Sequence, residues 1–540
     1  MDENKKLDKL SKKFFDAVIE RSPVFATYLG LHKFDKLMPD ESKKTYLEFI
    51  TIYKKFLKEF EKIKADKLNF DGKINLELAI HNLKLFLFDI QEIRYWEQNP
   101  DIVSSIGDAI FPLFVRDFAP FEKRIDNIIA RLEKSNKIIE QTKTRISKPV
   151  RLWTEIAIES CERIPSFFDE VLRTAKEKSI SKNKLLRLEK AIKKANGAVE
   201  EYKEYLQNKI LPKSAERFYI GEEKFRRLIG LRKLGMTPEE INKLGEKYLM
   251  ECKKQLQEIA NKIKAGATVE EARKIVDMNR PKTFNEILSA YRDSIIKAKK
   301  FVIENKIATM PKSEELLVIE TPIYMRHFIP FAAYFQPAKF DKKQLGIYVV
   351  TPTEQGNFER YNYADIHNTS VHEGYPGHHL QLSCANTNPH IIRIFDHATE
   401  FVEGWAHYCE EYMKEQGYDK SLEGAFVQTE DMIWRAARII IDVKLSTGKM
   451  SFDEAVEFLM KEAGKDKEGA VAEIKRYTSS PGYQLSYLLG KHMIKQLKQE
   501  LRKKFGKKFS DKIFHDTLLY SGSLPIYFHR KVLEQRFKTF

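Results

Sequence analysis

Histidines are concentrated in one short part of the sequence. Seven of the 13 histidines fall between residues 367 and 407. Imidazoles are common zinc ligands, and a carboxylate beside the first of them can serve as the general base of a hydrolase. His372-Glu373 has this arrangement, so the cluster predicts a metal site with hydrolytic chemistry.

The spacing of the second histidine departs from the regular zinc motif. In H-E-x-x-H, four residues turn about 400° and return the second imidazole to the same helix face. Here Pro376 occupies the fifth position, and His378 follows six residues after His372. Pro376-Gly377 would interrupt the helix and let His378 approach the metal. His378 is therefore favoured as the second ligand. His379 remains the alternative, although on an unbroken helix it would lie about 10.5 Å along the axis from His372.

A third ligand is expected to be a carboxylate from a following helix. Glu403 is the best placed in the sequence, and Glu400 and Glu410 are the alternatives. His407, one turn after Glu403, is a candidate for supporting the ligands from behind. One zinc ion per chain is predicted, and manganese or cobalt would also suit two histidines and a carboxylate.

Helical periodicity dominates the elements that must position these residues. Apolar residues recur on one face between residues 46 and 63, and again between 125 and 139. Capping boxes at Thr237 and Ser451 predict two helix starts. Residues 315–321 and 344–351 are rich in β-branched side chains and are predicted strands. The fold class is thus mainly α with a small sheet, divided by Pro-containing joints into regions 1–212, 213–311 and 312–540.

Composition narrows the class of protein. The chain has 540 residues, and its 94 Lys and Arg outnumber 78 Asp and Glu to give a net charge of +16, spread through mixed-sign helix faces. Its four cysteines form no CxxC pair, which favours a reducing compartment. No apolar run is long enough for a membrane span. These features predict a cytoplasmic protein without a nucleic-acid or membrane partner.

The motifs resemble the DUF885 family of gluzincin-like predicted metallopeptidases. That signature runs close to H-E-x-x-P-G-H-H-x-Q followed by E-G-W-A-x-Y-x-E, and both blocks occur here around His372 and Glu403. Further landmarks follow in the family's order at residues 22–32, 237–241, 473–487 and 524–526. The resemblance therefore covers nearly the whole chain. Departures occur at Lys444 and Ser446, where a Gly and a His are expected, and at His407, where a Leu is usual.

The resemblance implies a fold and a set of roles. The fold would be an elongated helical peptidase with a deep channel over the zinc, similar in outline to angiotensin-converting enzyme and the M32 group of carboxypeptidases. His372, His378 and Glu403 would hold the zinc, and Glu373 would be the general base.

Hydrolysis of a peptide bond makes further demands on the site. A tetrahedral oxyanion needs a hydrogen-bond donor, for which Tyr487 is the first choice and Tyr483 the reserve. An exposed strand containing Gly346 and Tyr348 could pair with the substrate backbone. Arg476 could receive a C-terminal carboxylate, although a structural ion pair is the more ordinary role of such an arginine.

The sequence therefore predicts a zinc-dependent peptidase acting on short peptides, as a carboxypeptidase or dipeptidyl carboxypeptidase. One alternative keeps the metal but hydrolyses a small non-peptide C–N bond. The other is a basic helical binding protein without catalytic activity, which would not need Glu373 beside the first histidine.

Overall fold

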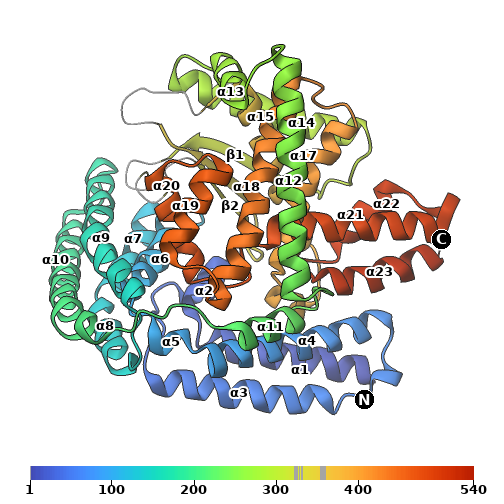
Figure 1. The fold of residues 1–540 in the computed structure, drawn as a ribbon. Helices are drawn as coiled ribbons and strands as arrows, with labels where there is room; N and C mark the ends of the chain where they lie inside the picture. Colours follow the sequence, from blue (N-terminus) through green and yellow to red (C-terminus); the bar gives the residue numbers. More distant parts are fainter. Residues whose placement is uncertain (1, 322–325, 327–328, 330–331, 353–360, 540) are drawn as a thin grey trace. The chain divides into compact units, whose positions relative to one another are not determined.

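The computed structural model describes residues 2–321, 326, 329, 332–352 and 361–539 (Figure 1). Over these residues the chain is mainly helical with one small sheet, as predicted. It divides into two compact units. The first contains Met1–Phe218 and Ala338–Lys342, and the second contains Tyr219–Pro322, Arg326–Pro337 and Lys343–Phe540.

The first unit is built from helices. The apolar stripe predicted between residues 46 and 63 lies on α3, whereas the stripe between 125 and 139 is shared by two consecutive helices, α7 and α8. The bounds are α1 Glu3–Ile19, α2 Pro23–Tyr28, α3 Lys43–Glu61, α4 Phe70–Phe88, α5 Tyr95–Gln98, α6 Ile102–Val115, α7 Phe121–Leu132, α8 Ser135–Arg145, α9 Arg151–Glu177 and α10 Lys182–Tyr205.

The second unit holds the histidine cluster. Both predicted capping boxes are present, with Thr237 starting α12 and Ser451 starting α19. Helix α12 packs along α18, and α17 along α21. The bounds are α11 Glu222–Leu231, α12 Pro238–Ile263, α13 Val269–Met278, α14 Phe284–Glu304, α15 Tyr363–Glu373, α16 His378–Asn386, α17 Thr399–Glu415, α18 Leu422–Thr447, α19 Phe452–Ala463, α20 Lys467–Thr478, α21 Ser486–Phe505, α22 Asp511–Tyr520 and α23 Ile526–Thr539.

A three-stranded sheet lies in the same unit. Both predicted strands are confirmed, as β1 Glu314–Glu320 and β3 Gln344–Val350, and a short strand β2 Ala332–Phe335 joins them. The strand order is β1-β3-β2, with β3 parallel to β1 and antiparallel to β2. Strand β3 is therefore central.

The boundaries between units differ from the predicted regions. The first unit's main segment ends at Phe218, close to the predicted joint at Pro212, whereas Pro311 lies inside the second unit, where α14 packs on β1.

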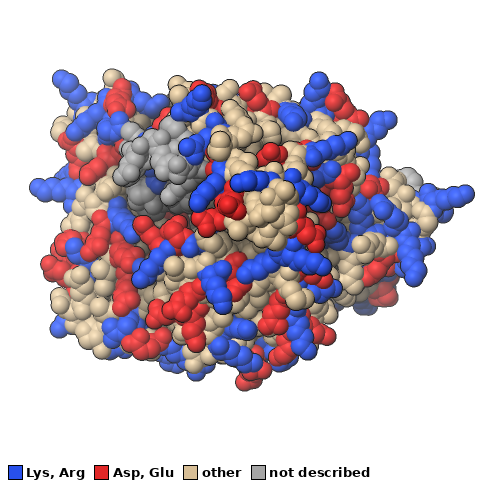
Figure 2. All heavy atoms as spheres, turned by 45° about the horizontal axis from the view of Figure 1, so that its top comes forward, with Lys and Arg blue, Asp and Glu red and all other residues tan. Residues whose placement is uncertain are grey.

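The described helices include none with both the length and the apolarity that a membrane crossing requires. On the face drawn in Figure 2, Lys and Arg alternate with Asp and Glu instead of forming a field of one sign. The deep channel over the zinc that the family resemblance implies stays a prediction.

Candidate metal centre

The histidine motif is a helix interrupted by a tight turn. Helix α15 ends at Glu373 and α16 begins at His378, as the Pro376-Gly377 pair predicted. The Gly377 amide donates to the carbonyl of Val371 at 3.1 Å. A Cβ on Gly377 would lie 1.8 Å from the carbonyl oxygen of His372, so no larger residue fits. The turn thus depends on glycine and places His378 at the first position of the next helix.

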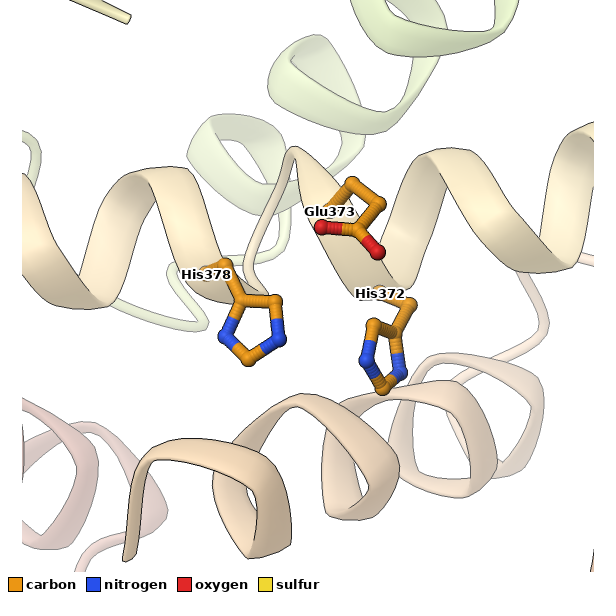
Figure 3. A group of neighbouring side chains, drawn as sticks. All are labelled: His372, Glu373 and His378. Carbon is orange, nitrogen blue, oxygen red and sulfur yellow. The ribbon is translucent and has the colours of Figure 1, made fainter. Parts of the chain in front are cut away.

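This turn brings the two imidazoles together. The ring centroids of His372 and His378 are 4.8 Å apart and the rings are nearly perpendicular. Figure 3 shows both rings pointing to the same side from successive helices, with the carboxyl group of Glu373 beside them. One ligand atom from each of the three side chains lies within 4.8 Å of the other two.

Glu403 on α17 completes the donor set. Its Oε2 lies 3.3 Å from Nε2 of His378 and 3.9 Å from Nε2 of His372. Ligand atoms about 2.1 Å from a tetrahedral zinc ion are separated by about 3.4 Å, so two imidazoles and one carboxylate at these distances fit zinc. Burial opposes ionisation, yet the two histidines and Tyr483 hold the pKa of Glu403 well below its usual range, and Glu403 raises the pKa of His378.

Glu410 orients the first histidine from behind. Nδ1 of His372 lies 2.6 Å from Oε1 of Glu410, which leaves Nε2 facing Glu403. Asn368 donates to the other oxygen of Glu410 at 3.2 Å, and Nδ1 of His407 lies 3.2 Å from it. Burial lowers the pKa of His407 to about 4, so this histidine is neutral. Glu410 therefore supports a candidate ligand and is not itself in the donor set.

Tyr483 holds the candidate third ligand. Its hydroxyl donates to Oε1 of Glu403 at 2.7 Å, which leaves Oε2 facing the histidines. The turn that contains Tyr483 is anchored by buried Asp442 on α18, which accepts hydrogen bonds from the amides of Gly482 at 2.8 Å and Leu485 at 3.0 Å. Gly482 has a φ of +78°, a conformation that favours glycine.

Two glycines let the helix that carries Glu403 and the helix that follows Tyr483 approach closely. Gly404 on α17 faces Gly490 on α21, and a Cβ on Gly490 would lie 1.8 Å from the carbonyl oxygen of Glu400. Neither position tolerates a side chain unless the helices separate. The glycine contact therefore sets the distance at which Tyr483 reaches the Glu403 carboxylate.

His379 faces away from the candidate metal centre. Its Nε2 lies 2.6 Å from Oε2 of Glu314 on β1, and its Nδ1 lies 3.0 Å from the hydroxyl of Tyr334 on β2. A Cβ on Gly346 would lie 2.5 Å from Nδ1 of His379, so the glycine makes room for this imidazole. Both ring nitrogens are engaged, and the structure brings His378 rather than His379 to Glu403.

The expected substrate-binding strand requires a correction. Residues 347–350 of β3 pair with β1 on one side and β2 on the other, so their backbone has no free edge for a peptide. Tyr348 is completely buried and belongs to the core. Tyr348 is therefore a core residue at the centre of the sheet. Gly346 pairs with Leu316 of β1 and makes room for His379.

The remaining predicted residues, Arg476 and Tyr487, lie on α20 and α21. The ring of Tyr487 contacts the ring of Tyr483, with centroids 6.2 Å apart, and Tyr483 in turn contacts Glu403. The centroid of the Tyr487 ring lies 4.7 Å from the guanidinium carbon of Arg438. Arg476 donates to Glu473 at 2.8 Å, and its side chain is 44% exposed. The ordinary ion-pair role considered for Arg476 is thus the one in the structure.

The alternative third ligands have other partners. Glu400 is buried and forms an ion pair with Arg232 at 2.7 Å, so it does not join the donor set. His397, another member of the histidine cluster, is exposed just before α17.

Known structures with the same fold have been determined. A putative lipoprotein of unknown function from Shewanella oneidensis is 23% identical, with a TM-score of 0.80 over 98% of this chain and 99% of that chain. A putative lipoprotein from Colwellia psychrerythraea is 20% identical, with a TM-score of 0.86 over the full length of both chains. At these identities the likeness concerns the fold. Comparison with curated proteins gave no match.

The family comparison covers almost all of the sequence. Residues 23–535 match the model described as "Bacterial protein of unknown function (DUF885)". The matched segment spans both units and includes the candidate donors His372, His378 and Glu403. The chain therefore belongs to the DUF885 family.

Proposed function

We propose that the protein is a zinc-dependent peptidase that cleaves short peptides near their C-terminus. The observation that carries the proposal is that three neighbouring carboxylates differ in their hydrogen bonds and ion pairs. Glu403 and Glu410 are both engaged by histidine and other polar side chains. Glu373, half-buried beside His372, makes no hydrogen bond or ion pair with the described residues. It is the carboxylate available for proton transfer.

The roles of the residues follow from this arrangement. His372, His378 and Glu403 would hold the metal, which when bound supplies Lewis acidity toward the scissile carbonyl and acidifies a water molecule. Glu373 accepts the proton of the attacking water and delivers it to the leaving amine. Tyr487, with burial raising its pKa to about 12, stays protonated and can donate to the developing oxyanion.

A group of cations on α18 supports recognition of a carboxylate. Arg435 is 8% exposed, and its Nε has no hydrogen-bond partner in the described part of the chain. Its Nη1 pairs with Asp431, which accepts from Asn368 at 2.9 Å, and Asn368 also donates to Glu410 behind His372. Arg438 lies one turn further along. Both Arg435 and Arg476 have a carboxylate partner, but only Arg435 also keeps a buried Nε without a hydrogen-bond partner. We therefore assign C-terminal recognition to Arg435 in place of Arg476.

The location of the protein is part of the proposal. All four cysteines are free and buried, which supports a reducing compartment and hence the cytoplasm. The two structural relatives are described as putative lipoproteins, so attachment to a membrane is the competing location. Fractionation of cells that express the full-length protein separates these: recovery in the membrane fraction overturns the cytoplasmic proposal.

The function is tested with purified full-length protein. Metal content and cleavage of a mixed short-peptide library by mass spectrometry are measured for wild type, Glu373→Gln and Glu415→Gln. Glu415 is exposed near the end of α17 and provides the matched loss of one carboxylate. About one zinc ion per chain is expected in all three proteins. Cleavage should fall by about 10²–10⁴-fold in Glu373→Gln alone, since general-base catalysis contributes this much.

Other outcomes contradict particular steps. Cleavage by metal-loaded Glu373→Gln at the wild-type rate would refute the assignment of the base. A zinc-loaded wild type that cuts no peptide but hydrolyses a small amide favours the amidase alternative. Unchanged metal content in His372→Ala and His378→Ala shows that the donor set is wrong.

A further inference from the structure

A second candidate site lies in the first unit, in a cavity of about 330 Å³. Its aromatic lining includes Tyr46, Tyr53, Phe86 and Trp96, and its acidic lining includes Asp89 and Asp101. The aromatic rings are held in pairs. Tyr46 stacks on Trp96 with centroids 5.0 Å apart, and Tyr53 contacts Phe86 with centroids 5.4 Å apart.

Asp89 is the unusual member of this lining. It begins a short π-helix, Asp89–Ile93, that follows α4. Its carboxylate makes no hydrogen bond or ion pair with the described residues, and burial raises its pKa. The residue is nevertheless exposed at the lining of the cavity, so a ligand can reach its carboxylate from solvent. A negative charge in this position favours the binding of a cation.

The other charged groups leave the cavity negative. Arg145 lines it, but this cation is balanced by Glu41, with Nη2 and Oε2 3.3 Å apart. Asp101 accepts hydrogen bonds from the hydroxyls of Ser104 at 2.7 Å and Ser160 at 3.1 Å, and neither donor carries charge. Asp89 and Asp101 thus lack a cationic partner, although the whole chain carries a net charge of +16.

We propose that this cavity binds an organic ammonium ion, with the cation beside Asp89 and against the Tyr53–Phe86 pair. Tyr46 and Trp96 are already engaged, because they stack on each other and lie against the guanidinium groups of Arg145 and Arg94. Aromatic faces attract cations electrostatically, by roughly 0.5–2 kcal/mol per ring depending on solvation, and they suit an alkylated ammonium better than a strongly hydrated metal ion. The cavity volume lies at the lower end of the range of small-molecule sites, about 300–1,000 Å³. The ligand is therefore a small amine, and this site is independent of the metal centre in the second unit.

The test uses choline, butylammonium and 3,3-dimethyl-1-butanol, the last being a neutral analogue of choline with the same shape. Isothermal titration calorimetry of the full-length protein should show binding of at least one of the two cations, and binding of the neutral analogue about tenfold weaker or absent. Asp89→Asn keeps the size of the side chain and removes its charge, so it should weaken cation binding about tenfold. Phe86→Leu keeps an apolar wall without the ring and should weaken binding severalfold.

A matched control separates the site from the general charge of the protein. Asp66, exposed on the short helix Ala65–Lys67 of the same unit, is changed to Asn and should bind as wild type does. Thermal unfolding of each variant verifies that it is folded. Absence of binding by both cations overturns the proposal. So does equal binding of choline and its neutral analogue, or unchanged cation affinity in folded Asp89→Asn.

Discussion

Replacing Glu410 with Gln should weaken metal binding without removing a ligand. In the structure Glu410 has a completely buried side chain and lies 2.6 Å from Nδ1 of His372. Its charge favours a proton on Nδ1 and so leaves Nε2 free to bind the proposed metal ion. Glutamine has nearly the same volume, so the substitution leaves the packing of α17 intact and removes the charge. His372 is then free to adopt the other tautomer or another ring orientation.

The size of the effect follows from how such carboxylates act. Removing a group that hydrogen-bonds a metal-ligating histidine weakens metal binding by about 10–100-fold, or about 1.4–2.8 kcal/mol. Asn368 also donates to Glu410, and Gln can turn its own carbonyl oxygen toward that amide. The substitution should therefore disturb the orientation of His372 but keep the hydrogen bond from Asn368.

Competition with a chelator of known affinity measures the change. Zinc dissociation constants are compared for wild type, Glu410→Gln and Glu415→Gln, the last of which removes an exposed carboxylate from the same helix. Thermal unfolding in excess chelator reports the stability of each metal-free protein. If folded Glu410→Gln binds zinc as tightly as wild type, Glu410 does not orient a ligand and the assignment of His372 Nε2 to the metal is unsupported.

Three further perturbations test other parts of the structure. Gly490→Ala should lower the free energy of unfolding by about 3 kcal/mol, since its Cβ would lie 1.8 Å from the Glu400 carbonyl oxygen, whereas Gly197→Ala, in the open middle of α10, should raise it by about 0.5–1 kcal/mol in urea titrations. Burial opposes protonation of His32, but carboxylates of Asp341 at 2.9 Å and Asp35 at 3.0 Å raise its pKa to about 9. The stabilisation is therefore complete below about pH 6.5 and lost as the pH rises through 9. Because the side chain is 31% exposed, solvent screens the ion pairs, and His32→Gln should lower the free energy of unfolding by only about 1–2 kcal/mol at pH 6. At pH 9.5 this difference between wild type and variant should have nearly disappeared. A pH-independent difference would contradict the ion pairs. Arg435→Lys should lower kcat/KM about tenfold or more for peptides with a free C-terminus and leave C-terminal amides unaffected, with Arg476→Lys as the control; equal losses on both substrates would contradict carboxylate recognition.

Local chemistry made much of the fold predictable. The amphipathic stripe on α3 and the capping boxes of α12 and α19 act over one or two helical turns, so their residues are neighbours in both sequence and space. Strands β1 and β3 were predictable from their β-branched residues. Strand β2 has only four residues, too few for a clear alternating pattern.

The turn between α15 and α16 is the part of the site that the sequence determined. Pro376 and Gly377 interrupt the helix, and only glycine fits against the carbonyl of His372, so the juxtaposition of His372 and His378 follows from seven consecutive residues. Membership of the DUF885 family was likewise predictable from these motifs, and the match over residues 23–535 confirms it.

Tertiary structure decided which other groups meet those histidines. Glu403, Glu410 and Glu400 are all acidic residues of α17. Their separate partners depend on where α15 and α16 pack against that helix and on the reach of Arg232 from the segment between α11 and α12. Tyr483 reaches Glu403 because Gly404 and Gly490 let two helices touch. Strand β3 became central because residues 314–320 and 332–335 pair with its two edges. Such contacts depend on packing between segments distant in sequence, and spacing along one chain cannot determine them.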